Sequence, residues 1–124
     1  MNAGTITGNK ILRVSGLNIM YGGGVHIAAT SGSSFTMKGG TISKNYSATY
    51  GGGVCVSNAN FIKTGGTIYG NDGGANANTA YTGGDAVYLR VVGTGGITRI
   101  RNTNAGTGIN LDPSVAGPSG GWEN

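Results

Sequence analysis

The stretch GGGVHI at residues 22–27 returns almost unchanged as GGGVCV at 51–56, with looser copies GDAVYL at 84–89 and GTGINL at 106–111. In the copies, Gly-rich positions precede an alternating pair of apolar residues, which is the pattern of a strand that buries one side. A unit that returns at a period of about 22 to 33 residues cannot bury its apolar side alone, so its copies must stack on one another. The repeat therefore predicts a solenoid.

A second motif accompanies the first and carries a Thr-Ile pair before an Asn. It reads GTITGN at 4–9, GGTISKN at 39–45 and GGTIYGN at 65–71, and the short strand candidates FTM at 35–37 and FIK at 61–63 lie between the two motifs. Each copy thus offers three short strands separated by Gly, Asn or Ser turns. This format is typical of a parallel β-helix, in which each strand pairs with its equivalent in the next turn of the chain.

These strands predict one all-β domain, a right-handed parallel β-helix of about four rungs with three short strands per rung. It is expected to span residues 1–111, and an irregular tail broken by Pro and Gly follows at 112–124. Alternation assigns the inward columns. They are Val25, Val54, Val87 and Ile109; Ile27, Val56, Leu89 and Leu111; and Ile6, Ile42 and Ile68. The residues between the first two columns are expected to face solvent: His26, Cys55, Tyr88 and Asn110.

Three asparagines, Asn9, Asn45 and Asn71, each stand three residues after an isoleucine of the second motif. Amide side chains that repeat at one corner can hydrogen-bond to the copies above and below. We therefore expect an internal asparagine ladder. The glycines before the valine are expected to supply positive φ angles or a close approach between neighbouring turns of the chain.

Composition limits the class of protein. Glycine makes up 27 of the 124 residues and charged residues only 10%, which alone would also suit a disordered linker, but disorder does not explain the regular phasing of the apolar residues. The single cysteine excludes an internal disulfide, and no apolar run is long enough to cross a bilayer. Low Lys and Glu with abundant Gly, Thr, Ser and Asn favours a secreted or cell-surface location.

The two motifs together resemble a known repeat. The segments at 42–54 (ISKNYSATYGGGV) and 6–25, with a looser copy at 68–87, are similar to the Phe-x-x-Asn and Gly-Gly-Ala-Ile motifs of the polymorphic outer membrane protein repeats of bacterial autotransporter adhesins. The similarity spans roughly residues 4–111. Ile replaces Phe, and Gly-Gly-Gly-Val replaces Gly-Gly-Ala-Ile. The resemblance implies a passenger on the bacterial outer surface that is used for adhesion or display.

Residues that carry chemistry are scarce, so we expect no enzyme, cofactor or metal site. The acids are scattered: Asp72, Asp85, Asp112 and Glu123. His26 and Cys55 are expected one rung apart on the outer face, where a thiol beside an imidazole could act as a nucleophile, but no third residue orients the pair. The proposed function is therefore a non-catalytic structural or adhesive module. A filament subunit that stacks end to end, and a carbohydrate-binding or polysaccharide-degrading β-helix, stay open as alternatives.

The formal net charge of +4 allows a polyanionic partner, although solvation of the charged faces is the simpler explanation. The cations are spread through every repeat with no aromatic stripe beside them, which disfavours nucleic acid. A glycan or a host-surface receptor, and self-association along the solenoid axis, are the expected partners. Contacts are expected at the turns 28–34 and 72–82. The candidate contact side chains are His26, Cys55, Tyr88, Tyr69 and Trp122.

Overall fold

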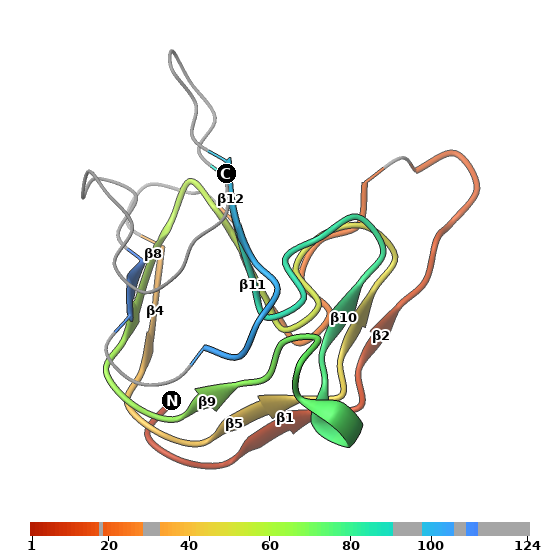
Figure 1. The fold of residues 1–124 in the computed structure, drawn as a ribbon. Coiled ribbons are helices and arrows are strands. Elements are labelled where there is room, and N and C mark those ends of the chain that lie inside the picture. Colours follow the sequence, from red (N-terminus) through yellow and green to blue (C-terminus); the bar gives the residue numbers. More distant parts are fainter. Residues whose placement is uncertain (18, 29–32, 91–97, 106–108, 112–124) are drawn as a thin grey trace.

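The computed structural model describes residues 1–17, 19–28, 33–90, 98–105 and 109–111, and these are folded as β-structure with parallel strands stacked in a solenoid-like arrangement (Figure 1). The first turn of the chain contains β1 (Thr5–Thr7), β2 (Lys10–Ile11), β3 (Val25–Ala28) and β4 (Ser34–Met37). The second contains β5 (Thr41–Ser43), β6 (Tyr46–Ser47), β7 (Val54–Ser57) and β8 (Asn60–Lys63). The third contains β9 (Thr67–Ile68), the short 3-10 helix η1 (Gly74–Asn76), β10 (Thr79–Ala80) and β11 (Val87–Arg90). The last strands are β12 (Thr98–Arg101) and β13 (Ile109–Leu111).

Each of the first two turns has four strands, one more than the three that we expected. Parallel pairing builds the sheets β1-β5-β9 and β2-β6-β10, the three strands β3-β7-β11, and the pair β4-β8. The additional strands are β2, β6 and β10, which follow the asparagine corner. They have only two residues each, too few to show an alternating pattern in the sequence.

The predicted apolar columns are confirmed within the first three turns. Val25, Val54 and Val87 pair in register, as do the three residues two positions further along each strand. Ile6, Ile42 and Ile68 form the column on the β1-β5-β9 sheet. Packing these columns against each other makes one continuous core that also includes Phe61, whose ring stacks on that of Phe35 with centroids 5.3 Å apart.

The glycines of the repeated motif have two separate tasks. The first glycine of each copy has a positive φ, +69° at Gly22 and +71° at Gly51, which favours glycine over all other residues. The next two glycines instead permit a close approach of neighbouring turns: a Cβ at Gly52 would lie 2.5 Å from the carbonyl oxygen of Thr79, and a Cβ at Gly53 2.5 Å from that of Ala86.

The predicted fourth rung is wrong, because the chain reverses direction after β11. β12 pairs antiparallel with β11, and β13 pairs antiparallel with β8, so that Ile109 lies opposite Lys63 and Leu111 opposite Phe61 instead of continuing the valine and leucine columns. Between them, Ala105 bridges Ile68 in the antiparallel sense.

The spacing explains this reversal. Only 22 residues separate Val87 from Ile109, against 29 and 33 for the two preceding steps, and β12 uses four of the 22 for its own pairing. Too little chain remains for another forward turn. The edge of a β-strand accepts a neighbour in either direction, so the segment pairs in the reverse sense instead.

Candidate functional site

A ladder of asparagines fills one corner of the solenoid, and its third member differs from the predicted one. The Asn9 side chain donates to Oδ1 of Asn45 at 3.0 Å, and the Asn45 side chain donates to Oδ1 of Asn78 at 2.9 Å. The backbone N–H groups of Asn9 and Asn45 donate to the same two oxygens. Asn78, and not Asn71, therefore completes the ladder. Asn71 is exposed, and its backbone N–H donates to the carbonyl oxygen of Asn102.

An insertion in the third turn changes the distance between Ile68 and the asparagine of the ladder. The segment from Gly70 to Ala77, with η1 in it, lengthens the third corner, so counting forward from Ile68 leads to the wrong residue. Counting backward succeeds, because Asn45 and Asn78 both stand nine residues before the valine of the following motif, Val54 or Val87. This spacing, which the second and third turns share, is the signal in the sequence that distinguishes Asn78 from Asn71, although in the first turn 16 residues separate Asn9 from Val25.

The predicted outward column of His26, Cys55 and Tyr88 has the expected register but only His26 is exposed. Cys55 and Tyr88 are buried, and the first glycine of each motif, Gly51 or Gly84, lies against their side chains. The Tyr88 ring stacks on that of Tyr50 with centroids 4.4 Å apart, and Tyr21 stacks on both. Two members of this column, Cys55 and Tyr88, are therefore covered by neighbouring groups, and only His26 reaches the surface.

The burial of Cys55 changes the acidity of its thiol. Its side chain has no exposed surface, and burial raises the pKa of its thiol to about 12, against the effects of Ser57 and Arg90, which lower it. His26, whose ring lies 5.4 Å from that of Tyr21, has a pKa lowered by burial. The pair therefore cannot supply a thiolate near neutral pH.

We accordingly expect Cys55 to be unreactive in the folded protein. Because the pKa of the thiol rises from its usual 9.0 to about 12, the thiolate fraction falls about a thousandfold, and burial blocks access further. A colorimetric thiol assay at pH 8 should show no fast reaction, and one equivalent should react after addition of guanidinium chloride. Rapid labelling of the native protein would contradict the buried position.

Of the other two predicted contact residues, only Tyr69 lies in the described part of the chain. Tyr69 is half-buried, its ring lies against Gly73, and its carbonyl oxygen accepts a hydrogen bond from the side chain of Asn78. Trp122 and the tail 112–124 lie outside the described residues, as do residues 29–32 of the turn 28–34. The turn 72–82 borders a hollow on the outer face of the β2-β6-β10 sheet.

This hollow follows from the alternation along three short strands. The outer face of the sheet carries one row of paired residues, which are Lys10, Tyr46 and Thr79. Ser47, the next residue after Tyr46, points to the opposite face and is fully buried. The following row on the outer face is Leu12, Ala48 and Tyr81. Neighbouring strands lie about 4.8 Å apart, so these side chains form a compact grid.

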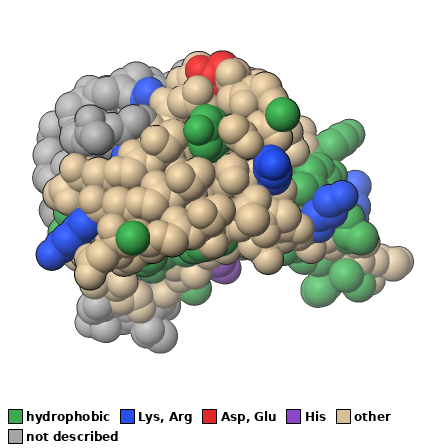
Figure 2. Space-filling model, turned by 90° about the horizontal axis from the view of Figure 1, so that it is seen from below, with side chains coloured by type: hydrophobic (Ala, Val, Ile, Leu, Met, Phe, Trp, Pro, Cys, Tyr) green, Lys and Arg blue, Asp and Glu red, His purple; other side chains and the backbone are tan. Residues whose placement is uncertain are grey.

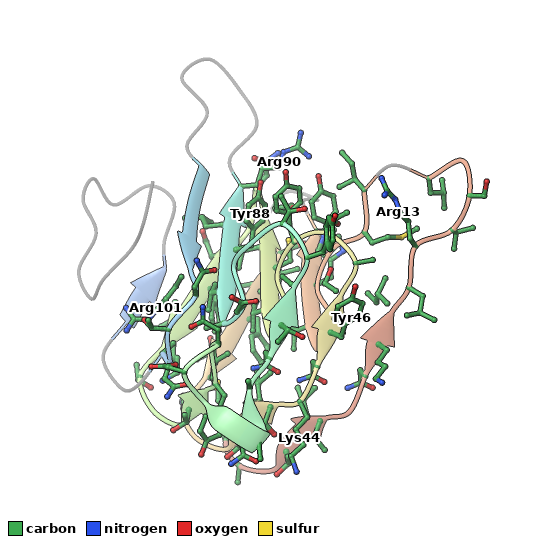
Figure 3. All side chains as sticks on the ribbon, turned by 45° about the vertical axis from the view of Figure 1, so that its right-hand side comes forward. Arg13, Lys44, Tyr46, Tyr88, Arg90 and Arg101 are labelled. Carbon is green, nitrogen blue, oxygen red and sulfur yellow. The ribbon has the colours of Figure 1, made fainter. Side chains whose placement is uncertain are left out.

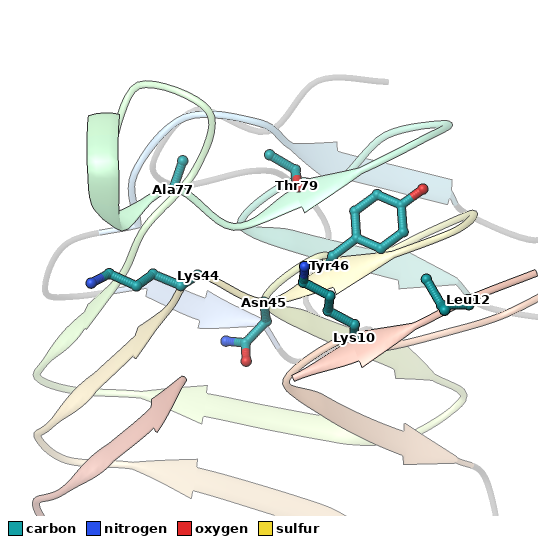
Figure 4. A pocket seen from close by; sticks show the side chains of 7 residues that line it. All are labelled: Lys10, Leu12, Lys44, Asn45, Tyr46, Ala77 and Thr79. Carbon is teal, nitrogen blue, oxygen red and sulfur yellow. The ribbon is translucent and has the colours of Figure 1, made fainter. Parts of the chain in front are cut away.

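We call the hollow formed by these rows the basic groove. Its first part, of about 420 Å³, is lined by Lys10, Leu12, Lys44, Asn45, Tyr46, Ala77 and Thr79 (Figure 4). Its second part, of about 270 Å³, is lined by Leu12, Arg13, Tyr46, Ala48 and Tyr81. Leu12 and Tyr46 line both parts, so the two parts adjoin. Figure 4 shows Lys10 rising from β2 toward Tyr46, with Lys44 on the far side of Asn45.

The groove is basic and aromatic. Lys10, Arg13 and Lys44 are exposed, and the Tyr81 side chain retains 80% of its exposure. Neither of the two described carboxylates lines it. Asp72 accepts a hydrogen bond from the backbone N–H of Asn104, and Asp85 accepts one from that of Ala80.

Three cations outside the groove have structural contacts. Lys63 is buried and donates to the carbonyl oxygen of Gly66, and burial, with a smaller effect of Arg101, lowers its pKa. Arg101 donates to the carbonyl oxygen of Asn104, and Arg90 donates to the hydroxyl of Tyr21. Figure 3 shows Tyr46 and Arg13 on the side away from Arg101, with Tyr88 and Arg90 together on β11.

Lys44 is held in an unfavourable backbone conformation. Its φ is +58°, whereas the equivalent residue of the first turn, directly before Asn9, is Gly8 with φ +75°. A lysine in this region costs about 1 kcal/mol relative to glycine. The described contacts of Lys44 include no side-chain hydrogen bond that offsets this cost, so its presence is explained better by the groove than by the fold.

We therefore expect Lys44→Gly to leave the fold intact and to raise the free energy of unfolding by up to about 1 kcal/mol. Urea denaturation followed by circular dichroism measures the change. Gly8→Lys, the reverse exchange at the equivalent corner, should lower the free energy of unfolding by a similar amount. A loss of stability in Lys44→Gly would mean that Lys44 stabilises the fold.

An apolar edge adjoins the groove. The segment after β2 exposes Leu12, Val14, Leu17 and Ile19, each by at least 50%. Figure 2 shows hydrophobic and basic side chains together at the right-hand end of the molecule, on the side where this segment lies in Figure 1. The surface here thus combines positive charge with apolar contact area.

The chain was compared with known proteins, and no family model, curated protein or solved structure matches it. In the part of the chain that the structure describes, no helix is long and apolar enough to span a membrane. Among the same residues, no three His, Cys, Asp or Glu side chains are grouped so that they could hold a metal ion.

Proposed function

We propose that this chain is a non-catalytic, extracellular or cell-surface β-solenoid module that binds its partner through the basic groove. The basic groove is the observation that carries the proposal, because it gathers three exposed cations and an exposed tyrosine that the fold itself does not require. Binding residues on strands and on the turns that flank them, held by a rigid stack of strands, are typical of recognition modules.

We further propose the right-handed parallel β-helix architecture of bacterial surface adhesins. The parallel register of Val25, Val54 and Val87 supports it, as does the general right-handedness of connections between parallel strands. The resemblance of the two motifs to polymorphic outer membrane protein repeats supports the surface location and the adhesive role.

The filament alternative is weakened by the antiparallel end. Copies that stack head to tail and continue the solenoid would need the strand edges of the last turn, but β12 and β13 already occupy the edges of β11 and β8. We expect a particle of discrete mass in size-exclusion chromatography with light scattering, and no fibres in electron micrographs. Masses that grow continuously with concentration would favour the filament instead.

Binding to whole surfaces tests the proposed function. Fluorescently labelled protein should bind to cell surfaces or to a broad glycan array, and Tyr81→Ala should reduce this binding. A thermally unfolded and refolded sample serves as the control for correct folding. Absence of binding to cells and to every glycan class would contradict the proposed function.

A further inference from the structure

We propose that the basic groove binds an acidic polysaccharide, with its sugar rings on Tyr46 and Tyr81 and its anionic groups on Lys10, Arg13 and Lys44. This inference rests on the proposed function and names the class of ligand for that site. It commits to a linear chain of sugars that carries carboxylate or sulfate groups.

Charge complementarity is the first reason. Three cations line a groove whose two parts meet at Leu12 and Tyr46, and neither described carboxylate is among the lining residues. Positive side chains without acidic neighbours raise the local concentration of anions and attract them over a distance of about 8–10 Å. A neutral ligand would form no ionic contact with the three cations of the groove.

The aromatic residues are the second reason. Tyr81 is 80% exposed, so its ring contributes little to the core, and Tyr46 lies one turn of the chain away beside Lys10. Tyrosine combines an apolar face with a hydroxyl group and loses little conformational entropy on binding, which suits amphipathic ligands. The apolar faces of sugar rings can cover such rings while their substituents reach the cations.

The shape of the site is the third reason. The groove lies over the parallel strands β2, β6 and β10, about 4.8 Å apart, and its two parts follow each other on either side of Leu12 and Tyr46. A ligand that contacts both parts must extend past Tyr46, which suits an extended chain better than a compact small molecule. The strained Lys44 stands at one end of it and Arg13 in the other part.

Nucleic acid shares the negative charge, but the groove does not favour it. Single-stranded nucleic acid is held by successive bases stacked on a row of aromatic side chains. Here Thr79 and Ala48 occupy the positions next to the two tyrosines in the rows of the groove. We therefore treat nucleic acid as an outcome of the test.

The experiment measures binding of hyaluronan, heparin, neutral dextran and a single-stranded DNA oligonucleotide to the purified chain by biolayer interferometry at low and physiological salt. We expect binding to hyaluronan or heparin and none to dextran. Hyaluronan carries only carboxylates and heparin also carries sulfates, so these two arms distinguish the sources of the charge. Affinity should fall as salt is raised, because the contacts are ionic.

Variants locate the site. Lys44→Gly and Tyr81→Ala should each weaken binding about fivefold or more, and Lys44→Gly should do so without loss of stability. Lys38→Ala is the matched control, since it removes one exposed positive charge outside the groove, and it should change affinity by less than about twofold.

Four results would overturn the inference, and three of them concern specificity. These three are equal binding of dextran, equal or tighter binding of the oligonucleotide, and an effect of Lys38→Ala as large as that of Lys44→Gly. Failure to bind either acidic polysaccharide while cell-surface binding persists would also overturn it, yet would leave the proposed function standing. Absence of binding in both assays would remove the proposed function itself.

Discussion

Replacing Asn78 with alanine is expected to lower the free energy of unfolding by about 3 kcal/mol or more, because it leaves several buried polar groups without partners. Asn78 is fully buried. Its Oδ1 accepts from both the backbone and the side chain of Asn45, and its side-chain amide donates to the carbonyl oxygens of Ile42 and Tyr69. Each unsatisfied buried group costs about 1–3 kcal/mol.

Asn71→Ala is the matched control, because Asn71 is the residue that counting along the motif assigns to the ladder. It is exposed, and its hydrogen bond to Asn102 uses the backbone N–H, which alanine retains. Its replacement should therefore change the free energy of unfolding by less than about 0.5 kcal/mol. Thermal and urea denaturation of the two variants measure the difference. An effect of Asn71→Ala as large as that of Asn78→Ala would show that the ladder follows the sequence motif instead.

Asn71 and Asn78 show which parts of the fold can be predicted from the sequence and which cannot. Alternation around Val54 and Ile42 was enough to predict the columns, because burial on one face specifies the register of a strand strongly. The third corner could not be placed by forward counting, since an insertion in a turn changes spacing without changing strand pairing. The equal distance from Asn45 to Val54 and from Asn78 to Val87 carried the missing information for the third turn.

The site was harder to predict than the columns. Cys55 and Tyr88 alternate as solvent-facing residues should, yet neighbouring groups cover them, and alternation within one strand does not reveal such a cover. The basic groove depends on two-residue strands that bring Lys10 beside Tyr46 and place Tyr81 in the next row. Because those strands are too short to be recognised, the sequence pattern did not place the tyrosines next to the cations.

Replacing Gly53 with alanine is expected to destabilise the protein by about 3 kcal/mol, or to prevent folding, because the added methyl has no space. An ideal Cβ there would lie 2.5 Å from the carbonyl oxygen of Ala86, 2.8 Å from Cγ2 of Ile68 and 2.9 Å from Nδ2 of Asn78. Parallel ladders on either side hold the neighbouring turns about 4.8 Å apart, so the backbone cannot move away without breaking hydrogen bonds.

The third turn offers the control for this effect. Ala86 occupies the position equivalent to Gly53, as the residue directly before the column valine, and its methyl is tolerated there. Ala86→Gly should therefore cost only about 1–2 kcal/mol, from the added flexibility of the unfolded chain and the loss of one buried methyl. Urea denaturation of both variants provides the comparison. If Gly53→Ala were as stable as the unmodified protein, the turns could not be stacked as closely as the glycines indicate, and the motif would need another explanation.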